Sequence, residues 1–530
     1  MRRLWWLAAV AAYAGCAAEA GPGGASRGSA SPDIHITFGT GSDALPKLAV
    51  QGGLSFEILD AATNRRMPGK LTILGVNGTR EPRFSKDIGV EIDNSLEAYD
   101  RVFSLSGVGV VALPIGTYDV TFSRGLEWTI ATQRITMTTA GVEVRAKLQH
   151  VVDTPHWVSG DFHVHAAASA DSRVPMRDRV YEFVADGVDM IVATDHNIVA
   201  NYQPVIADLH AEKYLASSTG DEITSGSWGH FGAFPLPHEM ESAGHGAIPV
   251  KKKSATDIFT EVRKTAPGAV IDVHHPRLEK GIGYFYLGKF DDQNDRSERK
   301  GFSYDFDAIE VLNGYQDTNR KTIDRVMQDW FALLDRGHLV TATGNSDTHH
   351  LNYNLGGYPR NYVNVANDDP QLVTAEDVAQ GVKAHHAFFT TGPIVSFRVG
   401  TTDIGDLAPA PGGKAKAEIT VRAAPWVSVS RVMIYVAGKL VKTWELTAHS
   451  TEIQRFHDTF DLAVANDTYV LVRVEGDKSL SPIVGGGKDV TVFPFALTNP
   501  IFLDTNGNGK YDPVLPHGTH GRNATEPEAN

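Results

Sequence analysis

Histidines and carboxylates recur at five places in the middle of the chain, at predicted strand ends. Imidazole and carboxylate are ligands for Zn, Mn or Fe, and the pattern offers no cysteine ligand. The pattern therefore predicts a site for two or three divalent metal ions. The places, in chain order, are Asp161-Phe162-His163-Val164-His165 with Asp171 shortly after it; Thr194-Asp195-His196-Asn197; Gly220-Asp221-Glu222 with Gly229-His230-Phe231; His274-His275-Pro276-Arg277; and Ser346-Asp347-Thr348-His349.

The spacing of these residues suits strand ends. His163 and His165 are two apart, so in a strand both imidazoles point to the same side. Compact apolar runs at 190–193, 269–273 and 339–342 predict strands, and the apolar spacing at 176–185, 255–264 and 322–335 predicts helices. Alternation of this kind indicates an α/β region from 153 to 399 with a mainly parallel sheet or barrel, whose strand ends build the site.

The flanking regions have a different pattern of apolar and turn residues. Residues 34–152 contain short alternating runs, such as 54–59 and 117–122, broken by Gly, Asn and Pro, which predict a β-sandwich. Similar runs return at 431–436 and 469–474, so 400–530 is predicted to be a second β domain. We find no internal repeat of fixed period.

The motifs of the central region resemble those of the PHP (polymerase and histidinol phosphatase) superfamily over about 157–393. With its flanking β domains, the whole chain looks most like the branch that includes the carbaryl hydrolase. The resemblance implies a distorted (β/α)7 barrel, flanked by β-sandwich-like domains, that binds up to three metals. The first metal would take His163, His165, Glu222 and Asp347; the second would share Glu222 and add His230 and His275; the third would take Asp171, His196 and His349. His274 is the alternative to His275; alternation along one strand lets only one of them point inward, and the family histidine precedes Pro.

This ligand set indicates hydrolytic chemistry. Glu222 can bridge two ions, and metal-bound hydroxide can attack an ester while the ions stabilise the developing charge. Asp195 either orients His196 or a neighbouring ligand, or caps a turn. Arg277 and Arg360 are candidate anion clamps, with solvated surface arginines as the alternative.

The first residues predict export. Arg2 and Arg3 precede a short apolar run, 4–14, which is typical of a signal peptide. The only cysteine, Cys16, ends Ala14-Gly15-Cys16, which resembles a bacterial lipobox, so 1–16 is predicted to be a lipoprotein signal with Cys16 lipidated. Residues 17–33 would be a flexible linker. Ala17 favours the outer membrane of a bacterial cell envelope, facing the periplasm or the exterior, with membrane contact through the lipid only.

A second cation site is predicted near the C-terminus. Asp504, Asn506, Asn508, Lys510 and Asp512 alternate around glycines like the first part of a calcium loop. The loop lacks the usual final Glu, because Leu515 stands there. The alternative is an Asn-Gly turn.

The function predicted from these patterns is metal-dependent hydrolysis of a small-molecule phosphoester at the cell envelope. One alternative is hydrolysis of a carbamate or carboxylic ester, and another is a non-catalytic binding lipoprotein that metals stabilise. The formal net charge of -14 argues against nucleic acid as a partner, because phosphate backbones repel it. Substrate, physiological metal, general acid, the role of the β domains and oligomeric state stay open.

Overall fold

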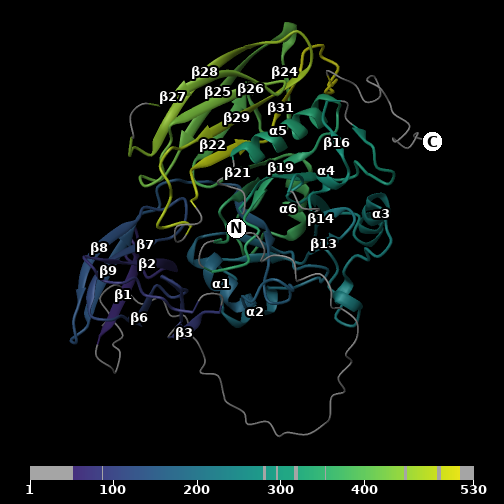
Figure 1. Ribbon diagram of the computed structural model, residues 1–530. Coiled ribbons are helices and arrows are strands. Elements are labelled where there is room, and N and C mark those ends of the chain that lie inside the picture. The colour runs from purple at the N-terminus through teal and green to yellow at the C-terminus, as the bar shows by residue number, and fades with distance from the viewer. Residues whose placement is uncertain are drawn as a thin grey trace, which may run out of the picture. The chain divides into compact units, whose positions relative to one another are not determined.

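The computed structural model describes residues 52–513, apart from 86–87, 93, 279–281, 294–295, 315–319, 352–353, 447–449 and 486–490 (Figure 1). All of these residues belong to one compact unit, Ile36–Asn530. The predicted signal peptide, Cys16 and the linker 17–33 lie outside the described residues. None of the described helices is both long and apolar enough to cross a membrane.

The first nine strands form two sheets around a shared apolar core. Alternate residues of β1, namely Leu54, Phe56 and Ile58, are fully buried in this core, as the alternating pattern predicts. One sheet has the order β6-β1-β9 and the other β3-β4-β5-β2-β7-β8. The strands are β1 (Gly53–Asp60), β2 (Gly69–Val76), β3 (Val90–Ile92), β4 (Ser95–Ala98), β5 (Arg101–Ser104), β6 (Val108–Ala112), β7 (Gly116–Ser123), β8 (Ala131–Met137) and β9 (Val142–Leu148).

The helices lie close to their predicted positions. The periodic segments at 176–185, 255–264 and 322–335 are α1 (Met176–Ala185), α3 (Ala255–Thr265) and α5 (Arg320–Asp335). A capping box of Ser254 and Asp257 satisfies the first amides of α3 and fixes where it begins. The other helices are α2 (Gln203–Asp208), α4 (Tyr284–Leu287), α6 (Ala375–Lys383), and the short 3-10 turns η1 (Ala243–Gly246) and η2 (Pro411–Gly413).

The predicted α/β class with a (β/α)7 barrel is wrong. Strands make up 40% of the structure and helices only 14%, so the molecule is mainly β. A (β/α)7 barrel needs a helical crossover between consecutive parallel strands. Here several neighbours pair antiparallel instead, including β13 with β14, β14 with β15 and β20 with β21.

The strands of the central region belong to two different sheets. A five-stranded sheet has the order β13-β14-β15-β18-β19, and an 11-stranded sheet runs β12-β11-β10-β20-β21-β30-β29-β26-β27, with β24 and β31 beside this path. Single bridges, Val164 with Thr348 and His196 with Glu222, link the two sheets where the predicted ligands lie. The strands of the central region are β10 (Trp157–Val164), β11 (Met190–Ala193), β12 (Ala216–Ser218), β13 (Asp221–Ser225), β14 (Gly229–Phe234), β15 (Val270–Val273), the small pair β16 (Phe290–Asp291) and β17 (Arg296–Ser297), β18 (Ala308–Asn313), β19 (Thr341–Asn345), β20 (Arg360–Asn364) and β21 (Ala387–Thr390).

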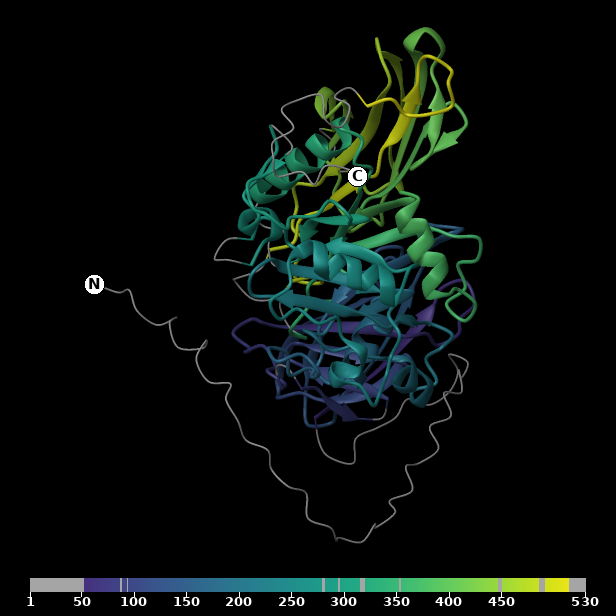
Figure 2. The ribbon, with the colours of Figure 1, turned by 90° about the vertical axis from the view of Figure 1, so that its right-hand side faces the viewer.

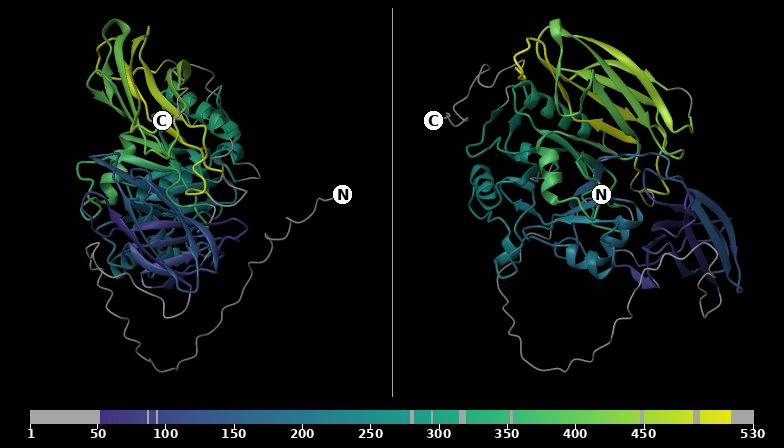
Figure 3. Two further views of the ribbon diagram at one scale, coloured as in Figure 1. Left: turned by 90° about the vertical axis from the view of Figure 1, so that its left-hand side faces the viewer. Right: turned by 180° about the vertical axis from the view of Figure 1, so that it is seen from behind.

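The C-terminal strands extend the long sheet and add a four-stranded sheet of order β23-β22-β25-β28. Ile419 and Val421 of β25 share one core with Val432, Val470 and Val472 of β26 and β29. The ribbon of the C-terminal strands is drawn in green to yellow in Figures 2 and 3. The predicted domain limits 34–152, 153–399 and 400–530 stay predictions. The strands are β22 (Ile394–Val399), β23 (Thr402–Asp403), β24 (Leu407–Pro409), β25 (Lys414–Arg422), β26 (Arg431–Val436), β27 (Lys439–Glu445), β28 (Gln454–Ala463), β29 (Thr468–Glu475), β30 (Phe495–Thr498) and β31 (Ile501–Asp504).

Candidate metal centre

The structure brings together all the side chains that were predicted to form the central metal site. They lie on or just after strands of both central sheets, although the chain does not form the predicted barrel. In four overlapping groups, ligand atoms from different residues lie within 4.8 Å of one another. The groups are His165, Asp171, His196 and His349; His163, Glu222 and His274; His163, His275 and Asp347; and His196, Glu222 and His230.

Glu222 lies at the centre of the cluster and is only 1% exposed. Imidazole nitrogens from six histidines approach its carboxylate. Oε1 lies 3.0 Å from His163 and His274, 3.1 Å from His230 and 3.3 Å from His275; Oε2 lies 2.7 Å from His196 and 3.5 Å from His165. The two oxygens thus face different sets of imidazoles, as a carboxylate that bridges two ions does.

Several buried ring nitrogens of the cluster lack hydrogen-bond partners among the residues that the structure describes and are therefore suited to bind metal ions. Nε2 of His163 lies 3.0 Å from Glu222 and 3.2 Å from Asp347, but it makes no hydrogen bond to any described residue. Nε2 of His165 is likewise buried without a hydrogen-bond partner in the described chain. Both nitrogens lie near Asp347, at 3.2 and 3.3 Å. Because a buried polar atom without a hydrogen-bond partner is unfavourable, the two nitrogens fit ligands of bound cations.

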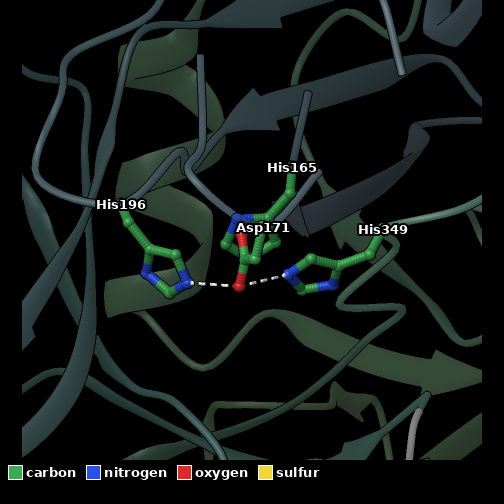
Figure 4. Close-up of side chains that lie close together, drawn as sticks. All are labelled: His165, Asp171, His196 and His349. Carbon is green, nitrogen blue, oxygen red and sulfur yellow. Dashed lines mark hydrogen bonds and ion pairs between the residues drawn. The ribbon is translucent and has the colours of Figure 1, made fainter. Parts of the chain in front are cut away.

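The outer group is the most exposed of the four. The imidazoles of His196 and His349 approach Oδ2 of Asp171 from two sides, at 3.0 and 3.2 Å (Figure 4). The Asp171 side chain is 51% exposed, whereas those of His163 and Glu222 in the inner groups are 0% and 1% exposed. An ion in this group would therefore be the one most open to solvent and substrate.

Both His274 and His275 face the cluster, which corrects the expectation that only one does. Strand β15 ends at Val273, and His275 has a φ of 28°, so strand alternation no longer governs the two side chains. The ring of His274 stacks on His163 with centroids 3.6 Å apart. It fits there because Gly232 has no side chain, and a Cβ at that position would overlap Nε2 of His274.

Sequence analysis missed several polar partners of the ligands. Nδ1 of His163 donates to Glu310 at 3.1 Å, and the hydroxyl of Ser169 lies 3.0 Å from Nδ1 of His165. The hydroxyl of Thr224 lies 2.6 Å from Nδ1 of His196. Glu310 could have been found as the lone charged residue in the apolar run 308–312, because a buried charge needs partners.

The cluster contains strongly coupled charges. Burial lowers the pKa of His163, but the carboxylates of Asp347, Glu222 and Glu310 outweigh it and raise that pKa well above its usual range. Burial also opposes protonation of His196, yet Glu222 and Asp171 raise its pKa to about 11. In the other direction, burial and the neighbouring His349 lower the pKa of His165 to about 3. Divalent ions could replace the protons on the first two histidines and balance the same carboxylates.

The three predicted catalytic residues outside the ligand set have other partners. Asp195 accepts a hydrogen bond from the amide of Ala166 at 2.7 Å, so it holds the backbone just after His165. Arg277 makes a bidentate ion pair with Asp329, at 2.7 and 2.6 Å. Arg360 donates to the carbonyls of Gly357, Gly187 and Asp186. Both guanidinium groups are thus engaged within the protein, and their role as anion clamps stays a prediction.

The predicted calcium loop forms a network of turns. The carboxylate of Asp504 accepts from the amides of Gly507 and Gly509, at 2.6 and 2.8 Å. The side-chain amides of Asn506 and Asn508 donate to Asp512, at 2.8 and 2.7 Å, and the amide of Lys510 donates to Asn508. This is the arrangement expected of the Asn-Gly turn alternative, and calcium binding stays a prediction.

Comparisons with known proteins add little. No family model and no curated protein match the chain. A candidate metal-dependent phosphoesterase from Bifidobacterium adolescentis is 16% identical, with a TM-score of 0.26 over 36% of this chain and 87% of its own. The CARDB domain of a Pyrococcus furiosus protein is 15% identical, with a TM-score of 0.15 over 21% of this chain and 95% of its own. Both TM-scores are too low to establish a shared fold.

Proposed function

We propose that this protein is a metal-dependent hydrolase of phosphoesters. The observation that carries the proposal is the approach of six imidazoles to the one buried carboxylate of Glu222. A structural ion pair needs one partner, and a buried carboxylate with six imidazoles around it has no comparable structural use. Divalent ions bound there would activate water and stabilise the negative charge that develops on an ester oxygen.

The charge of the site favours an anionic substrate. Asp171, Glu222, Glu310 and Asp347 all have pKa values below their usual range, in each case because nearby imidazoles outweigh the effect of burial. They are therefore ionised at neutral pH, and two divalent ions would balance them. A third ion in the exposed outer group would leave excess positive charge, which attracts a phosphate ester more than a neutral ester.

The location of this activity is part of the proposal. The predicted signal peptide and Cys16 support export to the bacterial cell envelope and attachment by a lipid. We propose small-molecule esters as substrates there, and no nucleic-acid partner.

Turnover measurements test the proposed reaction. Purified protein loaded with Zn, Mn or Fe would be assayed on aryl phosphates, aryl esters and aryl carbamates, beside a His163→Ala/His165→Ala variant. His457→Ala is the control, because that side chain is 47% exposed and on β28. Phosphate turnover that is lost only in the double variant supports the proposal. Turnover of esters or carbamates alone would move the function to those substrates, and full metal loading without any turnover would favour a binding protein.

A further inference from the structure

Glu310 is a buried carboxylate in the middle of β18, 1% exposed, that contacts two of the metal-ligating residues at once. Its Oε1 accepts from Nδ1 of His163 at 3.1 Å and from the side chain of Asn345 at 3.1 Å. Its Oε2 accepts from the backbone amide of His275 at 2.7 Å and from the side chain of Asn313 at 2.9 Å. Both oxygens are thus fully engaged with donors from four different residues.

The contact with His163 fixes which of its ring nitrogens is available. A carboxylate that accepts from Nδ1 holds the proton on that atom and leaves Nε2 free to bind a metal ion. Nε2 lies on the other side of the ring, 3.0 Å from Glu222 and 3.2 Å from Asp347. His163 belongs to two of the metal-binding groups, so its orientation matters for both.

The contact with His275 fixes a backbone conformation. The φ of 28° at His275 is in the left-handed region that residues with a Cβ seldom adopt, and such conformations persist only where the surroundings stabilise them. By accepting the His275 amide, Glu310 holds this turn after β15. The turn places Nε2 of His275 3.3 Å from Glu222.

We propose that Glu310 is a positioning residue that prepares the two inner groups, those of His163 with His274 and of His163 with His275, for metal binding. This inference rests on the proposed function. Glu310 is not itself one of the grouped ligands. Because one carboxylate orients ligands of both groups, removing it weakens both inner ions together and leaves the outer group of Asp171 unaffected.

Metal titration of the Glu310→Gln and Glu310→Ala variants tests this role. Metal-free protein is titrated with Zn and with Mn against a chromophoric chelator, and thermal unfolding of the metal-free protein is measured in parallel. Glu57→Gln is the matched control, because Glu57 is a fully buried carboxylate that pairs with Arg66 and Arg145 in the N-terminal sheets. We expect Glu310→Gln to raise the Kd of the inner ions by about 10- to 100-fold. Glu310→Ala should raise it further, because Gln keeps an acceptor for one of the two contacts.

The outcomes separate this inference from the proposed function. Weaker inner sites in Glu310→Gln, with unchanged binding in Glu57→Gln, support a positioning role. Wild-type Kd values in Glu310→Gln, with the same loss of thermal stability as the control, would show that Glu310 only stabilises the fold and would overturn the inference. If wild-type protein itself binds no metal, the proposed function fails first. Should Glu310→Ala not fold, Glu310→Gln alone decides.

Discussion

The substitution Glu222→Gln is the sharpest single perturbation of the cluster. Gln has almost the shape of Glu, but it removes one negative charge and replaces one oxygen with an amide donor. Four imidazole nitrogens lie within 3.3 Å of Oε1, and two more lie within 3.5 Å of Oε2. The substitution therefore removes a shared anionic ligand and leaves the packing nearly unchanged.

The size of the effect can be estimated from the number of ligands. A structural Zn site with four ligands binds with about 10–16 kcal/mol, so one ligand accounts for roughly 3 kcal/mol. That loss corresponds to a Kd about 100-fold higher. Because the two oxygens of Glu222 face different groups, we expect at least two ions to bind more weakly by about this factor.

The assay is a chelator-competition titration of metal-free wild type, Glu222→Gln and the Glu57→Gln control, with circular dichroism to check folding. A folded Glu222→Gln protein that binds all its ions with wild-type Kd would refute the reasoning. In that case the imidazoles around Glu222 would form a hydrogen-bonded core rather than a metal site.

Three further results follow from the structure. Metal-free protein should lose stability as the pH rises above about 6.5, because histidines with a raised pKa, such as His196 at about 11, stabilise the fold only while they are protonated. Thermal unfolding of metal-free protein from pH 6 to 10 measures this loss, and a stability that does not change with pH would contradict it. Gly232→Ala should displace the ring of His274, lower the free energy of unfolding by about 1–3 kcal/mol and weaken metal binding. Gly268→Ala is the control, because a Cβ there meets open space, and it should have none of these effects. Chemical denaturation and metal titration of both variants measure the difference. Asp171→Asn should lower the metal content by one equivalent and spare the inner ions, and unchanged content by elemental analysis would exclude the outer site.

The gathering of the site residues was more predictable than the fold around them. Local patterns were enough for the helix at 176–185 and the strand at 190–193. The two-residue spacing of His163 and His165 also predicted that both imidazoles face one side, and their Nε2 atoms lie 3.2 and 3.3 Å from Asp347, although they belong to different groups. The barrel was wrong because strand pairing depends on distant partners. Nothing in the local sequence indicates that β21 pairs with β30, whose residues follow more than a hundred positions later.

Two local features also escaped prediction for physical reasons. The choice between His274 and His275 assumed that the strand continued, but it ends at Val273 and the backbone then turns through a positive φ. Glu310 belongs to no recognisable sequence motif, because three of its four partners, His163, His275 and Asn345, come from distant parts of the chain. Only its position inside an apolar run marked it as a charge that must be compensated.

Metal content tests the central claim most directly. Purified protein and the His163→Ala/His165→Ala variant would be reconstituted with Zn, Mn and Fe, desalted and measured by elemental analysis. The structure predicts about two to three equivalents of transition metal in the wild type. Because His163 belongs to the inner groups and His165 to the outer group, the variant is expected to lose both inner and outer ions. Less than about one equivalent in folded, reconstituted wild-type protein would contradict the account.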